Sequence, residues 1–260
     1  MRRFFLLGFI ITTGCFDAYC QEAPASNGNK VTSTYFPITF SVGTQVPVQN
    51  EIRISYNFRK LRRSYFSMFL QAGYPSYMDE AIDYIFDEED PANTYLKKHL
   101  EGRFSAGCGT YWNSSHWRLG LLFQYTSYAI RNRTAREMVE NLIPENGEEI
   151  VTAMNNFSMR FPMFGDFYNN YLLTSKIWFY QLGIQGGYQF KLYKNSRFGC
   201  RIEIGAITVF SNSLEITCNQ SNIASDFVIS AITEPLNEEI QEGMQWTIIP
   251  TVTLSMAYNF

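Results

Sequence analysis

The sequence predicts an all-β protein, an eight-stranded antiparallel transmembrane β-barrel with long extracellular loops that contain short helices. Three observations predict this fold. Eight segments alternate apolar and polar residues with a period of two. These segments are longer than the strands of about 5–6 residues that are usual in globular proteins. The connections between them alternate short and long, as turns and loops do in membrane barrels.

The N-terminus predicts an export signal. Arg2 and Arg3 supply a positive start, and residues 4–14 form an apolar stretch that is too short to span a bilayer. A cleavage site at Ala18-Tyr19-Cys20 is the main interpretation, and a lipoprotein signal at Cys15 or Cys20 is the alternative. We therefore expect a signal peptide at 1–20, a flexible periplasmic leader at 21–33 and an outer-membrane barrel at 34–260.

The last strand segment, 245–260, shows the alternation most clearly. One face is apolar from Trp246 to Phe260, and the other is polar or small except for Ile249. The eight segments are 34–46, 51–59, 64–74, 103–112, 117–130, 176–192, 198–211 and 245–260. Each therefore predicts a strand with one apolar and one polar face.

The apolar faces are expected to meet lipid and the polar faces to line the lumen. The apolar faces carry aromatic residues near both strand ends, while the polar faces are rich in Gly, Ser, Thr, Gln and Arg. A soluble β-sandwich with the apolar faces inside is the alternative. The export signal, the strand length and the aromatic ends favour the membrane barrel.

The connections support this choice independently. The turns at 60–63, 113–116 and 193–197 are short, whereas the connections at 75–102, 131–175 and 212–244 are long. The first hairpin, at 47–50, is the one short member of the second set. An even number of strands then places both termini in the periplasm.

The C-terminus resembles a known signature. Tyr258-Asn259-Phe260 closes an amphipathic strand and resembles the C-terminal signal of bacterial outer-membrane barrels, which the barrel-assembly machinery reads. Over 34–260 the chain resembles the small eight-stranded outer-membrane proteins of the OmpA/OmpX type, and its signal peptide resembles those of Bacteroidota. The resemblance implies the outer membrane of a Gram-negative bacterium, in contact with outer-membrane lipid and lipopolysaccharide. It carries over no catalytic residue.

The charges are distributed unevenly along the chain. The formal net charge is −3, yet the loops 75–102, 132–175 and 212–244 carry −6, −3 and −6. A lumenal charged cluster is predicted by strand parity, and its members are Arg53, Arg59, Arg103, Arg118, Lys191, Arg201, Glu51 and Glu203. Because unpaired buried charge is costly, we expect loop acids to fold into the barrel mouth, or water and anions to fill part of the lumen.

Two loop segments predict helices. Ser76-x-x-Asp79 and Thr134-x-x-Glu137 resemble capping boxes, and apolar residues recur on one face after each. An aromatic cluster near the end of the second long loop is a possible loop binding surface, consisting of Phe157, Phe161, Phe164, Phe167, Tyr168 and Tyr171. The acidic residues 87–90 lack the spacing of a calcium loop and are expected to form a solvated face.

No motif indicates catalysis, a cofactor or a metal site. The chain has only 2 His, and His99 is the sole candidate base near the long loops. The near-neutral charge gives no case for nucleic-acid binding. Large lumenal side chains such as Phe69 and Tyr111 predict a plugged interior. We therefore expect a non-enzymatic surface protein whose loops bind a surface protein or glycan, adhere or assemble envelope complexes. A narrow pore or binding site for a small solute is the alternative, and an outer-membrane enzyme is less favoured.

Overall fold

The computed structural model describes residues 36–58, 64–76, 78–85, 89–114, 116–142, 147–162, 169–191, 197–218 and 223–260. The predicted signal peptide and leader lie outside these ranges. The strands are β1 (Ile38–Val46), β2 (Gln49–Asn57), β3 (Ser64–Pro75), β4 (Leu100–Ser114), β5 (Trp117–Thr134), β6 (Leu172–Lys191), β7 (Phe198–Cys218) and β8 (Ile248–Asn259). The helices are α2 (Met78–Ile85), α3 (Pro91–His99), α4 (Ala135–Leu142), α5 (Gly147–Arg160) and α7 (Ile223–Met244).

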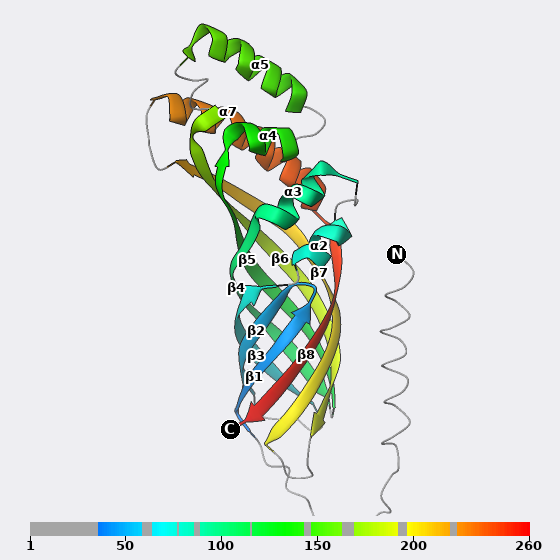
Figure 1. Ribbon diagram of the computed structural model, residues 1–260. Helices are drawn as coiled ribbons and strands as arrows, with labels where there is room; N and C mark the ends of the chain where they lie inside the picture. The colour runs from blue at the N-terminus through cyan, green and yellow to red at the C-terminus, as the bar shows by residue number, and fades with distance from the viewer. Residues whose placement is uncertain are drawn as a thin grey trace, which may run out of the picture. The chain divides into compact units, whose positions relative to one another are not determined.

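The eight strands form a closed antiparallel barrel in sequence order, as predicted (Figure 1). Closure is visible at Val42 of β1, which pairs with Ile52 of β2 on one side and with Met256 of β8 on the other. Where the ring of strands is complete, the barrel has no free strand edge. The backbone N–H and C=O groups of the strands there therefore find hydrogen-bond partners on the neighbouring strands.

The apolar faces point outward and the polar faces point inward. Along β2, Glu51, Arg53 and Ser55 are buried, while the intervening Ile52 and Ile54 are 50% and 56% exposed. A soluble sandwich would bury the second set, so that alternative is wrong. The arrangement is that of a barrel with hydrocarbon outside and a polar lumen inside.

Aromatic side chains bound the apolar outer surface. Near the end that carries the C-terminus, the rings of Trp117 and Tyr188 lie 5.3 Å apart. Further along the same two strands, the rings of Tyr125 and Tyr180 lie 5.5 Å apart. A tilted strand needs roughly 9–11 residues to cross the hydrocarbon core, and the segment from Trp117 to Tyr125 has this length. Beyond Tyr180 the outer face becomes polar, with Lys176 and Glu215 forming an ion pair of 3.6 Å.

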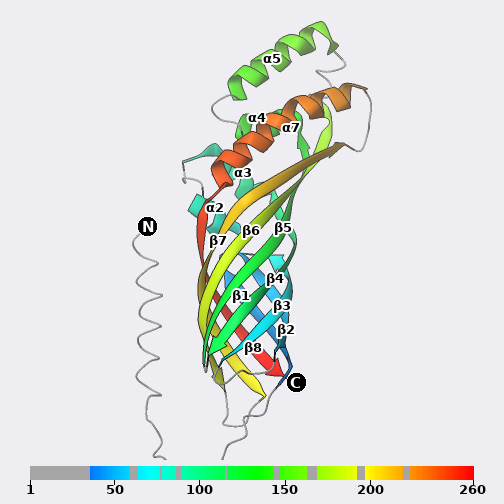
Figure 2. The same cartoon turned by 180° about the vertical axis from the view of Figure 1, so that it is seen from behind.

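Three strands continue past the barrel and form what we call the wall. β5, β6 and β7 have 18, 20 and 21 residues, whereas β1 and β2 have 9 each. β8 pairs with β7 only as far as Thr208, so the last ten residues or so of β7, roughly 30 Å of strand, extend beyond this ladder. Figure 2 shows these strands rising above the others.

Helices α2, α3, α4, α5 and α7 gather at the wall, and we call them the cap (Figures 1 and 2). Met138 and Val139 of α4 and Ile232 of α7 are fully buried, in one cluster with Ile130 and Leu173 of the wall. Their burial explains why the wall's inner face is apolar while the barrel's inner face is polar. No helix of the described part is long and apolar enough to cross a bilayer.

Helix α4 begins as its sequence predicts. The Thr134 hydroxyl accepts from the Glu137 amide at 3.2 Å, and the Glu137 carboxylate accepts from the Thr134 amide at 3.4 Å. This is the reciprocal capping box, which satisfies two backbone donors of the first turn. The predicted apolar face of α4 is also confirmed, since Met138 and Val139 are buried.

The sequence prediction was incomplete in the third long connection. Residues 212–218 continue β7 and residues 223–244 form helix α7, where only a loop was expected. Among the described residues, β5 and β6 also extend further into the cap than predicted, to Thr134 and from Leu172.

Candidate functional site: a filled lumen and a helical cap

A charged layer crosses the lumen between β2, β5 and β7. Arg53 forms ion pairs with Glu51 at 2.8 Å and with Glu203 at 3.1 Å. Arg118 lies 3.4 Å from the other carboxylate oxygen of Glu203. These side chains are at most 3% exposed, so the ion pairs are shielded from water. Two of the eight predicted cluster residues, Glu51 and Glu203, thus serve as partners for its arginines.

Two aromatic rings complete this layer. The Arg53 guanidinium lies 4.5 Å from the Phe69 ring centroid, and that of Arg118 lies 3.9 Å from the Tyr111 centroid. The Tyr111 hydroxyl lies 2.7 Å from the Gln185 side-chain oxygen. Gly120 makes room for the Tyr111 ring, because a Cβ there would lie 2.4 Å from a ring carbon. Phe69 and Tyr111 therefore fill the lumen, as large inward residues were expected to do.

A second layer, nearer the cap, is made of uncharged amides. Gln49 donates to Gln45 at 3.2 Å and to Gln124 at 3.2 Å, and Gln71 donates to the same Gln124 oxygen at 3.0 Å. Gln124 donates in turn to Thr126 at 3.2 Å. All five side chains are buried. Because they come from β1, β2, β3 and β5, their hydrogen bonds cross the lumen. Sequence parity placed Gln45, Gln71 and Gln124 inward, whereas Gln49 was assigned to the hairpin at 47–50. The alternation gave no sign that the four join in one layer.

Arg201 stands apart from the two glutamates. Its guanidinium donates to Gln189 at 3.2 Å and to Ser41 at 3.4 Å, and no carboxylate of the described residues lies within ion-pair distance. Arg201 is 4% exposed. The expected entry of loop acids into the lumen is not seen in the described part, where the arginines use the strand residues Glu51 and Glu203 instead.

Of the three other members of the predicted charged cluster, the structure describes the side chain of Arg103. Arg103 is exposed, so its lumenal assignment is wrong. The β4–β5 register shifts between Gly102 and Phe104, and this bulge at Arg103 breaks the alternation on which the assignment rested. Arg59 lies outside the described residues, and so does the side chain of Lys191.

The predicted aromatic loop surface is only partly described. Phe161 is 49% exposed, whereas Tyr171 packs against the apolar cluster of the cap. The structure therefore places these two in different surroundings. The side chains of Phe157, Phe164, Phe167 and Tyr168 lie outside the described residues.

The C-terminal residues close the barrel. The Phe260 amide donates to the Ile38 carbonyl at 2.9 Å, which ties the end of β8 to the start of β1. The Tyr258 ring lies 4.7 Å from both the Phe198 and the Phe260 rings. These outward aromatics fit the membrane boundary at the end opposite the cap.

His99 is engaged within the cap. Its Nδ1 accepts from the Arg133 guanidinium at 2.7 Å, and its ring packs edge-on against Tyr95 at 4.9 Å. Burial, together with the positive charges of Arg133 and Lys98, lowers the pKa of His99. The histidine is therefore held as a neutral acceptor.

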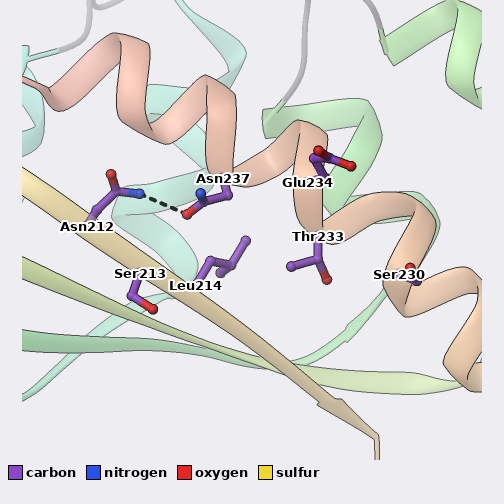
Figure 3. Close-up of a pocket in the computed structure, with 7 residues that line it drawn as sticks. All are labelled: Asn212, Ser213, Leu214, Ser230, Thr233, Glu234 and Asn237. Carbon is purple, nitrogen blue, oxygen red and sulfur yellow. Dashed lines mark hydrogen bonds between the residues drawn. The ribbon is translucent and has the colours of Figure 1, made fainter.

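The cap carries a polar pocket between α7 and the wall (Figure 3). Its volume is about 510 Å³, and its lining consists of Asn212, Ser213, Leu214, Ser230, Thr233, Glu234 and Asn237. Sequence reasoning missed this pocket because it treated residues 212–244 as a loop.

No group of three or more metal-ligating side chains occurs in the described part of the chain. Asp90 of the acidic stretch accepts from the Ala92 amide at 2.8 Å and caps α3.

Comparisons with known proteins return structures only. No protein-family model matches the sequence, and no curated protein matches it. A major outer membrane protein from Thermus thermophilus aligns over 86% of this chain and 99% of its own, at 11% identity and a TM-score of 0.38. Acinetobacter baumannii CarO aligns over 86% and 96% at 7% identity and a TM-score of 0.28. Acinetobacter baumannii CarO2 aligns over 86% and 98% at 11% identity and a TM-score of 0.25. These values add nothing to what the closed barrel shows by itself.

Proposed function

We propose that this chain is an outer-membrane protein of a Gram-negative bacterium whose closed barrel anchors the cap, and that the cap binds a ligand outside the cell. The observation that carries the proposal is the pair of hydrogen-bonded layers across the lumen. The charged layer joins β2 to β7, and the amide layer joins β2 to β5. With the lumen filled, the wall and cap are the parts left to act on other molecules.

The orientation follows from the distribution of connections. The helices lie at one end of the barrel and the C-terminus at the other (Figure 1). Long connections face the exterior in bacterial outer-membrane barrels, and short turns face the periplasm. The cap is therefore extracellular, the apolar belt contacts outer-membrane lipid and lipopolysaccharide, and Tyr258 and Phe260 serve as the signal for barrel assembly.

We assign no catalytic role to the cap. His99 would be the base of an enzyme, yet its Nδ1 is taken by Arg133 and its pKa is lowered. A general base needs a free acceptor within hydrogen-bond reach of the substrate proton and a pKa near the working pH. Binding without chemistry is the function that this arrangement supports.

A narrow anion path is the second candidate. Arg201 is buried without a carboxylate partner among the described residues, and Arg53 and Arg118 lie in the same lumen. An excess of buried positive charge favours an anion over a cation. The cross-lumen contacts argue against passage, so conductance separates the two functions.

Single-channel recording of the refolded protein in a planar bilayer tests the proposal. We expect no steady conductance, because both layers block the lumen. A control variant with Tyr111, Gln49 and Gln124 all changed to Ser shortens both layers and should conduct if it folds. Heat-modifiable gel migration reports folding of each protein. Steady conductance of the unmodified protein would overturn the closed-barrel proposal in favour of the anion path.

A further inference from the structure

We propose that the polar pocket between α7 and β7 binds a neutral saccharide. This deepens the proposed function and depends on it only in that the cap must face the exterior. The pocket volume of about 510 Å³ lies within the range of small-molecule sites, roughly 300–1,000 Å³. Figure 3 shows the lining side chains coming from one helix and one strand.

An asparagine pair at one end of the pocket has fixed hydrogen-bonding roles. The Asn212 amide nitrogen donates to the Asn237 side-chain oxygen at 3.0 Å. This contact leaves the oxygen of Asn212 as an acceptor and the nitrogen of Asn237 as a donor, since no other hydrogen bond of either side chain is found in the described part. An acceptor beside a donor matches neighbouring sugar hydroxyls, each of which both donates and accepts.

Hydroxyl groups supply the rest of the polar lining. Ser213 of β7 and Ser230 of α7 are exposed, and their hydroxyls have no partner among the described residues. Thr233 donates to the Ile229 carbonyl at 2.6 Å, which leaves its oxygen able to accept from a ligand. Leu214 adds one apolar side chain, against which the C–H face of a sugar ring can pack. The lining thus offers several neutral donors and acceptors around a small apolar surface.

The charges of α7 decide against charged ligands. The helix contains acidic residues but no Lys or Arg, so phosphorylated, sulfated or sialylated ligands are repelled. Glu234 is the one acidic residue of the lining, and it is exposed. An exposed ion pair contributes little to binding, because water screens both charges. A cationic amine would therefore gain little from Glu234 and would leave the neutral groups unused.

The pocket is open to ligands from the exterior. Its strand residues follow Thr208, where the β7–β8 ladder ends, so they belong to the wall beyond the barrel. Pro235, which lies beside the pocket residues of α7, interrupts the backbone hydrogen bonds of the helix because it has no amide hydrogen to donate. The site thus lies above the lipid belt, where sugars of the cell surface or the surroundings are present.

Ligand-observed saturation-transfer NMR on the full chain in lipid nanodiscs is the test. Nanodiscs are required because alkyl-glycoside detergents would themselves occupy a sugar site. The probes are glucose, galactose, mannose, N-acetylglucosamine and lactose, with 3′-sialyllactose and spermidine as the anionic and cationic comparisons. We expect at least one neutral sugar to bind with a Kd near 1 mM, about −4 kcal/mol.

Two variants and a matched control locate the site. Ser230→Trp fills the pocket and should weaken binding about 10-fold or more, whereas Ala231→Trp, on the neighbouring exposed position outside the lining, should leave the Kd unchanged within about 2-fold. Asn237→Ala removes the free donor and should weaken binding without adding bulk. Gel heat-modifiability confirms that each variant folds.

The outcomes separate this proposal from the closed-barrel proposal. Absence of binding by all neutral sugars, preference for sialyllactose or spermidine, or binding that Ser230→Trp leaves intact would overturn the saccharide site. A silent barrel with no sugar binding would refute the pocket ligand alone. A conducting barrel whose sugar binding is sensitive to Ser230→Trp would refute the closed lumen alone.

Discussion

Glu203 is shared by two buried arginines. It lies 3.1 Å from Arg53 and 3.4 Å from Arg118, at 1% exposure. Glu203→Gln leaves both guanidinium groups with one charged partner fewer in a site closed to water. Removing one partner of a buried pair costs about 3–5 kcal/mol, so we expect a loss of about 3 kcal/mol. Urea unfolding in lipid vesicles, followed by gel migration, measures it.

Arg201→Gln is the matched control for this change. Arg201 is buried to a similar degree but bonds only to Gln189 and Ser41 among the described residues, so removing its charge leaves no carboxylate there without an ion-pair partner. We expect a loss of about 1 kcal/mol or less. Equal losses for the two variants would mean that the shared carboxylate is not the centre of the charged layer.

The sequence predicted which strand residues face inward more successfully than it predicted their partners. Period-two alternation correctly placed Arg53, Arg118 and Arg201 in the lumen. It failed at Arg103, because a bulge inserts one residue without altering the local composition. The pairing of Arg53 with Glu203, 150 positions apart, depends on ring closure and register, which no local pattern reveals.

At the scale of elements, strong local signals were predictive and weak ones were not. Helix α4 has a capping box and a clean apolar face, and both were identified. Helix α7 has no basic residue in its last turn and contains Pro235 in its interior, which a sequence interpretation takes as a helix break. Its apolar residues Val228, Ile232 and Leu236 are buried only because the wall and α4 are there to cover them. The saccharide pocket was therefore beyond sequence reasoning.

Helix α3 should loosen on acidification. The pKa of His99 is lowered in the folded protein from its usual value near 6.5, so the locally opened form binds a proton more readily than the closed form. The stabilising effect of neutral His99 is complete above about pH 6.5 and is lost as the pH falls toward its lowered folded pKa. We expect faster amide exchange in residues 92–99 at about pH 5.5 than at about 7.5, after correction for intrinsic rates.

His99→Gln is the control for this titration. Glutamine keeps an acceptor for Arg133 but has no proton to gain, so the corrected exchange should no longer change with pH between these values. Persistence of the pH dependence in this variant would assign it to another group of the cap. The Asp83–Lys97 pair lies there too, but it keeps the pKa of Asp83 below its ordinary value, outside this interval.

At the scale of the molecule, the apolar belt should define the depth of the barrel in the bilayer. Leu121 lies midway between Trp117 and Tyr125 and is 63% exposed. Leu121→Arg places a charge at the centre of the hydrocarbon and should cost about 2–4 kcal/mol of folding free energy. Thr174→Arg lies beyond Tyr180 on the polar outer face of β6 and should cost less than about 1 kcal/mol.

Vesicle refolding titrations compare the two variants. Similar losses of folding free energy for Leu121→Arg and Thr174→Arg would mean that the hydrocarbon core lies elsewhere along β5 and β6. Brominated lipids provide a second measure, since bromine quenches nearby tryptophans by depth. Trp246 is exposed, and its amide donates to the carbonyl of Val209, which pairs with Gln181 beside Tyr180 at the cap end of the belt. Trp117 and Trp246 should therefore be quenched most by bromine near the headgroups, and least by bromine at the chain ends.

The unequal strand lengths make the barrel asymmetric about its axis. Only β5, β6 and β7 of the eight strands rise into the wall, so the cap is supported from one side of the ring. A barrel in a membrane rotates about its axis and diffuses in two dimensions, and a neighbour in the same membrane can approach it from any direction. The pocket beside β7 presents itself to only some of those directions. A neighbour in the same membrane therefore meets the pocket only when the barrel has rotated to face it. A molecule arriving from solution is not restricted in this way.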